Sequence, residues 1–176
     1  MKKYILILIL VIYPQILILA QTPVQSYINT INEHGINKIE GNIINSSNEK
    51  IFLDKLNSYR KSYGLEPLIY DYNLELASKL QVMYEYTIDE CTHENIYLPE
   101  IEDRIALTSY GYIGTVVENT LFAGTISEDD LDELILKLYK SSKSHNEALL
   151  MDYVKKVGSF SIFINNELYN FLLMTN

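Results

Sequence analysis

The chain has 176 residues and a formal net charge of −9, because 23 acidic residues outnumber 14 lysines and arginines. Its pI is near 4.8. This acidity argues against a nucleic-acid partner, which would need a basic stripe, and against charge-driven adhesion to anionic membranes. The hydrophobic fraction is 48%, enough at this length for one domain with an apolar core.

Residues 1–20 are typical of a signal peptide. Two lysines precede an apolar run over residues 5–11, and a second run over 16–20 ends on the small residue Ala20. Pro14 interrupts the run, which disfavours the alternative of a membrane anchor, since a spanning helix needs ~20 apolar residues. We therefore expect cleavage after Ala20, a secreted extracellular protein, and no stable membrane span after cleavage.

Cys91 is the only cysteine of the chain. A secreted protein with one cysteine cannot form an internal disulfide, so its stability must come from the apolar core. A lone thiol among ordinary neighbours favours a buried packing position. Pairing with another chain is the alternative.

Residues 21–49 are predicted to form a linker or N-terminal extension. A short helix would open at Thr22-Pro23 and close near His34, and an Asn-rich polar stretch follows it. His34 is interpreted as a surface residue at the helix end. Asn45 begins a glycosylation sequon that has meaning only in a eukaryotic secretory route.

Two helices are predicted in the first part of the remaining chain. Residues 46–64 carry a broad apolar face, with a capping-box pattern at Ser46 and a stop at Gly64. A short extended connection over residues 67–69 leads to Asp71, which is suited to cap a second helix. That helix is apolar around most of its girth, so we expect a central, buried element that ends near residues 85–87.

The second part of the chain combines loops, one helix and strands. Residues 95–114 are predicted to be loop, and 116–122 extended. Ser127 is expected to cap a helix that ends at 141–142. The three acidic residues after Ser127 are interpreted as first-turn residues that interact favourably with the helix dipole, rather than as a calcium loop. A hairpin follows, with strands over 157–164 and 167–173 joined at Asn165-Asn166. The pattern predicts an α/β sandwich around one small sheet.

Short motifs from residue 50 to the C-terminus share an order and spacing with one known family. They are Leu56-Asn57-Ser58-Tyr59-Arg60 with Gly64-Leu65-Glu66-Pro67-Leu68, Leu74 and Ala77, His93, Glu118-Asn119 before Gly124, and Tyr139-x-x-Ser142-x-x-His145 before Leu149-Leu150 and Val157-Gly158. This series resembles the CAP superfamily, which includes cysteine-rich secretory proteins, antigen 5 and pathogenesis-related-1. The last motif is similar to the microbial, SCP-like form.

The resemblance implies an α-β-α sandwich with a small, mostly antiparallel sheet over residues 50–176. It also implies a central cavity lined by two histidines and one or two acidic residues, which here are His93, Glu118 and His145. The family's second acidic position is Ser142, which cannot supply a charge. Tyr139 replaces the usual tryptophan and Val117 the usual glycine, so the fold transfers better than any activity.

His93, Glu118 and His145 allow three interpretations. Two neutral imidazoles and a carboxylate can bind a divalent metal, and zinc fits these ligand types best. The same groups could form a proton relay for hydrolysis, although Ser142 and Ser144 need not meet His145 in the geometry a nucleophile requires. The third interpretation is a hydrogen-bond network that ties loops to the sheet. No residue is assigned a catalytic role.

Together these features predict a secreted, non-enzymatic CAP-domain protein that binds through a cavity lined by His93, Glu118, His145 and Ser142. Its ligand would be a small apolar molecule such as a sterol or fatty acid, a divalent metal, or an extracellular protein partner. Lipid binding enters only through the resemblance. The alternative is an extracellular hydrolase that uses the same residues, with or without zinc. A third prediction is an adhesive or structural protein tethered by residues 21–50.

Overall fold

The computed structural model describes residues 50–106, 108, 114–126 and 130–176. The chain divides into two compact units, Met1–Lys38 and Ile39–Asn176, and all described residues belong to the second. The predicted signal peptide and the extension over 21–49, with its sequon, lie outside the described residues. Within the described part, no helix combines the length and apolar character needed to cross a membrane.

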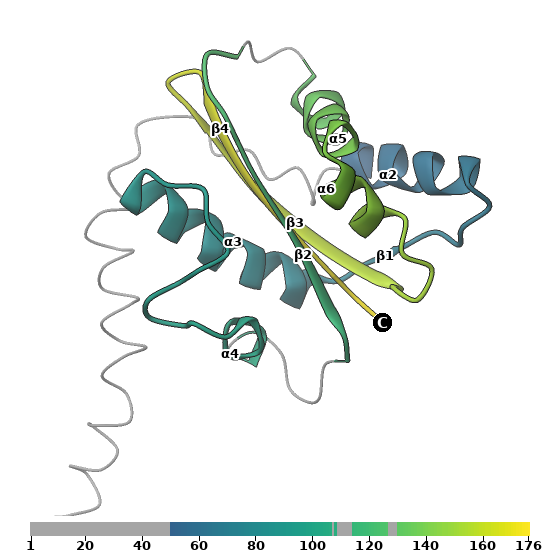
Figure 1. Ribbon diagram of the computed structural model, residues 1–176, viewed down its shortest axis with the longest axis horizontal. Helices are drawn as coiled ribbons and strands as arrows, with labels where there is room; N and C mark the ends of the chain where they lie inside the picture. Colours follow the sequence, from purple (N-terminus) through teal and green to yellow (C-terminus); the bar gives the residue numbers. More distant parts are fainter. Residues whose placement is uncertain (1–49, 107, 109–113, 127–129) are drawn as a thin grey trace, which may run out of the picture. The chain divides into compact units, whose positions relative to one another are not determined.

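A four-stranded sheet forms the middle of the described part (Figure 1). Its strands are β1 (Ile69–Tyr70), β2 (Val116–Ala123), β3 (Lys156–Ile164) and β4 (Glu167–Thr175), in the order β1-β3-β4-β2. β3 and β4 are an antiparallel hairpin, β2 pairs antiparallel with β4, and only the two-residue β1 is parallel to its neighbour. β2 is therefore an edge strand of the sheet.

Helices cover both faces of this sheet (Figure 1). One layer holds α2 (Lys50–Ser62), α5 (Leu131–Ser141) and α6 (Lys143–Leu149), and the other holds α3 (Tyr72–Ile88) and α4 (Ile101–Ala106). The prediction of an α-β-α sandwich with a mostly antiparallel sheet is confirmed.

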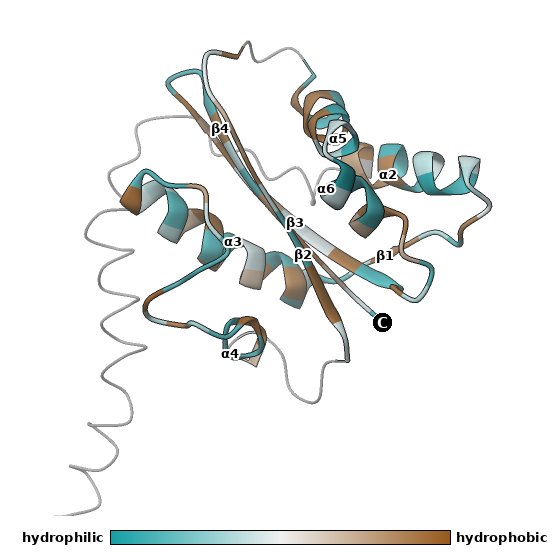
Figure 2. Cartoon of the chain, viewed as in Figure 1, coloured by the Kyte–Doolittle hydropathy of each residue, from teal (hydrophilic) through white to brown (hydrophobic). Residues whose placement is uncertain are grey.

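The main apolar cluster lies between the sheet and the layer of α2, α5 and α6 (Figure 2). It includes Leu56, Ile135, Leu149 and Leu172, each with no measurable exposure. β3 and β4 are buried on both faces along almost their whole length. Strands covered on both sides read as continuous apolar runs, which is why the hairpin could be predicted from the sequence.

Special backbone positions determine where the elements turn. The Asp71 carboxylate accepts from the backbone N–H of Asn73 at 2.9 Å and so caps α3 as predicted. Asn165 and Asn166 both have positive φ, 53° and 66°, which fits a two-residue type I′ hairpin. A Cβ on Gly158 would lie 2.1 Å from the backbone nitrogen of Glu75, so a glycine is needed where α3 crosses β3.

Several predicted boundaries are wrong. The segment predicted as loop over 95–114 contains α4, a short helix whose central residues Arg104 and Ile105 are buried by tertiary packing. α5 begins at Leu131 with Asp130 as its cap, so Asp130 does not lie in the first turn. A short helix that was not predicted, α6, follows α5 and contains His145. The predicted cap Ser127 lies outside the described residues.

Candidate functional site

The edge strand β2 divides the candidate residues between the two faces of the sheet. Successive side chains of a strand point to opposite faces. The side chains of Glu118 and Thr120 contact the α3 side, where Glu118 meets His93 and Thr120 meets Glu85. Asn119 contacts the other side, where its Nδ2 donates to the carbonyl of His145 at 3.2 Å. The motif Glu118-Asn119 thus links both layers through one strand.

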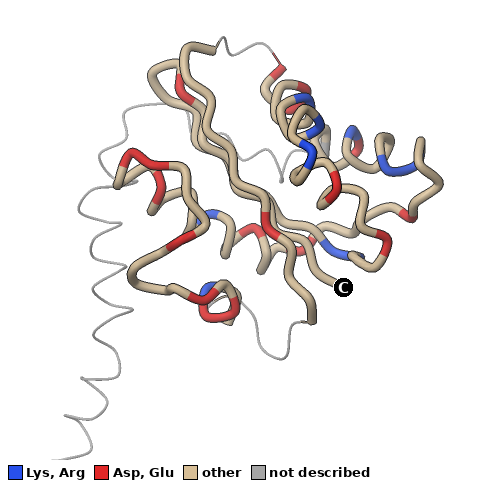
Figure 3. The backbone as a smooth tube through the Cα atoms, viewed as in Figure 1, with Lys and Arg blue, Asp and Glu red and all other residues tan. Residues whose placement is uncertain are grey.

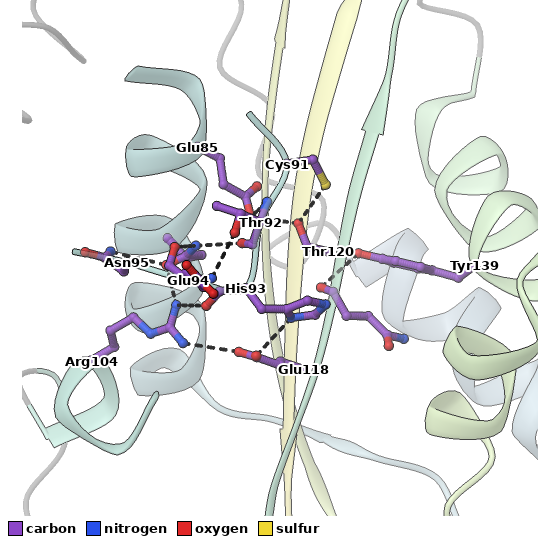
Figure 4. Close-up of polar contacts among 12 residues, drawn as sticks. Glu85, Cys91, Thr92, His93, Glu94, Asn95, Arg104, Glu118, Thr120 and Tyr139 are labelled. Carbon is purple, nitrogen blue, oxygen red and sulfur yellow. Dashed lines mark hydrogen bonds and ion pairs between the residues drawn. The ribbon is translucent and has the colours of Figure 1, made fainter. Parts of the chain in front are cut away.

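His93 and Glu118 form the central pair of the site (Figure 4). His93 lies in the loop after α3, and its Nδ1 is 2.9 Å from Oε1 of Glu118. A carboxylate only accepts hydrogen bonds, so Nδ1 is the donor and Nε2 remains unbonded by this pair. The His93 side chain is 49% exposed and that of Glu118 23%. The imidazole is therefore held from one side and accessible from the other.

Arg104 of α4 binds the carboxylate of Glu118 as well. Its Nη2 is 3.2 Å from Oε2 of Glu118, so each carboxylate oxygen of Glu118 has a different partner. Its Nη1 donates to Oε1 of Gln81 and lies 3.4 Å from the carbonyl of His93. The Arg104 side chain is only 2% exposed, and the guanidinium carbon lies 5.7 Å from the centre of the Phe171 ring. An ion pair this buried constrains geometry more than a surface pair does.

Gln81 of α3 fixes the loop that carries His93. Its Nε2 donates to the carbonyls of Thr92 at 2.8 Å and Glu94 at 3.2 Å, one residue on either side of His93. Its Oε1 accepts from Arg104 and from Nδ2 of Asn95, the latter at 3.2 Å. All four hydrogen-bonding positions of this buried amide are used, which gives the loop a unique placement.

A second polar cluster lies deeper on the same face (Figure 4). Thr120 Oγ1 donates to Oε1 of Glu85 at 2.7 Å, and Cys91 Sγ lies 3.3 Å from the same hydroxyl. Burial raises the pKa of Glu85 to about 8, although Thr120 and the backbone of Thr92 oppose the rise. Burial also raises the pKa of the Cys91 thiol. The prediction of a buried Cys91 is wrong for the residue as a whole, which is exposed in the loop after α3, although its sulfur is partly covered beside Thr120.

His145 lies near the His93–Glu118 pair but belongs to the other helical layer. Its ring packs edge-on against Tyr139, with ring centres 5.5 Å apart. Burial lowers the pKa of His145, and the neighbouring His93 contributes to the decrease. Ser142 is at the N-cap position of α6 without a side-chain capping hydrogen bond, and its Oγ lies 3.3 Å from Oγ of Ser144. Within the described residues no hydrogen bond joins a serine or cysteine side chain to either imidazole.

Solved structures show which fold this is. No protein-family model and no curated protein matches the chain. An outer surface protein of Borrelia burgdorferi matches with a TM-score of 0.62 and 21% identity over 77% of this chain and 98% of that chain. An extracellular protein of Bacillus anthracis containing an SCP domain matches with a TM-score of 0.61 and 17% identity over 76% of this chain and 42% of that one.

A cysteine-rich secretory protein of Staphylococcus aureus matches with a TM-score of 0.53 and 17% identity over 75% of this chain and 39% of that chain. This chain has the CAP fold. It spans less than half the length of the Bacillus and Staphylococcus proteins, and at these identities the likeness concerns the fold alone. The resemblance that the sequence motifs indicated is confirmed at that level.

The CAP fold brings His93 and Glu118 into contact but leaves His145 outside their hydrogen-bond network. Among the described residues, no group of three or more His, Cys, Asp or Glu side chains is arranged to hold a metal ion. Each oxygen of Glu118 accepts a hydrogen bond from a protein donor, His93 on one side and Arg104 on the other. The arrangement fits a hydrogen-bond network better than a three-ligand zinc centre.

Three residues of the network were not singled out as site residues from the sequence. Gln81 and Glu85 fall within the predicted helix over α3, one helical turn apart, and both are fully buried polar residues. The signal available in the sequence was the position of these polar residues inside an apolar stripe, because a polar side chain there needs a partner. Arg104 had no such signal, because its segment was predicted to be loop.

Proposed function

We propose that this chain is an extracellular CAP-fold protein that acts by binding, with the exposed side of His93 as its contact point. The observation that carries the proposal is that Glu118 pairs with both His93 and Arg104 while the His93 side chain stays 49% exposed. A site with its charges already paired is suited to hold a ligand in a fixed orientation. Secretion or surface display is supported by the signal-peptide pattern and by the extracellular and outer-surface proteins that share the fold.

An apolar molecule or a protein surface is the ligand class that the loop favours. Ile96, three residues after His93, is 74% exposed, so the same loop presents an apolar side chain and an imidazole. Sterols, fatty acids and protein surfaces all combine apolar area with a few polar groups. Two hollows of about 580 and 500 Å³ flank α2, but the candidate residues do not contribute to their lining.

The direct test is uptake of a labelled sterol and a labelled fatty acid by the purified protein. Binding that weakens at least tenfold in His93→Ala, but not in the matched His34→Ala variant, would support the lipid form of the proposal. If neither lipid binds at micromolar protein, the lipid form is wrong and protein partners remain. Zinc addition is measured in parallel: an increase in melting temperature that depends on His93 would favour metal binding instead.

A hydrolase is the second candidate, because the Glu118-His93 pair has the orientation of a general base. Glu118 accepts from Nδ1 of His93, so Nε2 can accept a proton from a water molecule or a substrate hydroxyl. Ester and peptide substrates test this directly. Turnover that disappears in both His93→Ala and Glu118→Ala would establish catalysis and contradict a purely binding role.

A further inference from the structure

The α3–α4 layer is strongly acidic, and Arg104 is its buried cation. From Tyr72 to Ala106 the sequence contains eight carboxylate side chains and only two basic residues, Lys79 and Arg104. Lysines and arginines otherwise lie mainly on α2, α5 and α6 (Figure 3). Burying a guanidinium costs free energy unless it is paired, so its position has to be explained by its contacts.

Two of the side chains that Arg104 binds, Glu118 and Gln81, bear on the orientation of His93. Nη2 binds Glu118, which in turn accepts from Nδ1 of His93. Nη1 binds Gln81, whose amide holds the carbonyls on both sides of His93, and also lies near the carbonyl of His93 itself. The planar guanidinium can serve these acceptors at once because its donors have a fixed fork geometry, which lysine lacks.

Phe171 supports the same arrangement from the sheet. This fully buried residue of β4 lies under Arg104 at 5.7 Å and contacts the His93 ring edge-on at 6.4 Å between centres. The ring limits how far either side chain can tilt. Hydrogen bonds join Arg104 to Glu118 and Glu118 to His93 (Figure 4). The exposed fraction of the side chain increases along this series, from 2% to 23% to 49%.

We propose that Arg104 is a positioning residue: it fixes Glu118 so that His93 is held as the Nδ1–H tautomer and presents Nε2 outward as a hydrogen-bond acceptor. The site would then favour a ligand that offers a hydroxyl or amide N–H donor to this nitrogen. The tautomer follows from the contacts of Arg104 and Glu118 whatever the ligand is. The ligand class rests on the proposed binding function.

The test measures the protonation of each ring nitrogen by ¹⁵N NMR on the full chain without ligand, at a pH where the ring is neutral. Wild-type His93 is expected to carry its proton on Nδ1. Arg104→Met, which keeps the length but removes charge and donors, is expected to shift the population toward Nε2–H. Arg104→Lys, which keeps a charged donor beside Glu118, is expected to retain most of the Nδ1–H form. Lys140→Met, which removes an exposed cation near Tyr59, serves as the control and should change nothing.

A wild-type ring protonated on Nε2, or an Arg104→Met variant that keeps the Nδ1–H form, would overturn the proposal. If Arg104→Met does not fold, the variants Glu118→Ala and Arg104→Lys replace it in the test. Glu118→Ala is expected to lose the Nδ1–H form, and Arg104→Lys is expected to retain it. Any other pattern overturns the role of Arg104. Because no ligand is present, failure here is distinct from failure to bind sterol or fatty acid. That binding assay tests the proposed function separately.

Discussion

Glu118 and Asn119 are neighbours in β2, yet they contact opposite layers of the protein. Glu118 binds His93 and Arg104 on the α3–α4 side, and Asn119 binds the backbone of His145 on the α6 side. The two-residue period of a strand is the cause. As a result, the two histidines are linked through one edge strand and do not share a single carboxylate.

Replacing Glu118 by alanine should destabilise the fold by about 2–3 kcal/mol. The change leaves the buried Arg104 without its carboxylate partner, and an uncompensated buried charge is costly. Chemical denaturation measures the change in the free energy of unfolding. The matched control is Glu147→Ala, which removes the carboxylate of an exposed pair with Lys143 at 3.9 Å and should cost less than about 1 kcal/mol. Equal losses in both variants would mean that the Arg104–Glu118 pair is not specially stabilising.

Replacing Gln81 by alanine should loosen the loop around His93. The variant removes the donors that hold the carbonyls of Thr92 and Glu94, and leaves buried partners unsatisfied at a cost of about 1–3 kcal/mol. Hydrogen exchange of the loop amides should speed up well beyond the change in β3 or β4. The matched control is Asn57→Ala, which removes an amide that bonds Leu68 in the other layer. Loop exchange that responds equally to both variants would contradict a local role for Gln81.

Glu85 should make the protein less stable as the pH rises. Its pKa is about 8 in the fold against an ordinary 4.5, so the folded state binds a proton that the unfolded state loses first. This stabilisation is fully present below about pH 4.5 and is lost progressively until about pH 8. Glu85→Gln keeps the contact with Thr120 but does not titrate. As the pH rises, the free energy of unfolding of the wild type should therefore decrease relative to that of the variant, by at most about 5 kcal/mol. A difference that does not change with pH would refute a buried, protonated Glu85.

Cys91 should react slowly with thiol reagents at neutral pH despite its exposure. Burial of the sulfur raises its pKa, and only the thiolate reacts. The rate of disulfide exchange with an aromatic disulfide should be several-fold below that of glutathione at the same pH. It should increase on denaturation, which removes the contact with Thr120. A native rate at or above the glutathione rate would show that the thiol is activated rather than protected.

Much of the fold could be predicted from the sequence because its signals are local. Asp71 caps α3 through its own side chain, and Asn165-Asn166 form the hairpin turn through positive φ angles that asparagine tolerates. The mostly apolar sequences of β3 and β4 reflect burial on both faces. α4 lacked such a signal: its six residues are helical because Arg104 and Ile105 are buried against other elements.

The sequence motifs and their order identify His93, Glu118 and His145 as candidate site residues. How these residues divide between the two faces of the sheet depends on tertiary packing, because the relevant contacts join residues far apart in the chain. Arg104 reaches Glu118 across 14 residues, and His93 reaches it across 25. Whether a carboxylate binds a metal, a base or an arginine depends on which side chains packing brings to its two oxygens. In this protein, packing brings one histidine and one buried arginine.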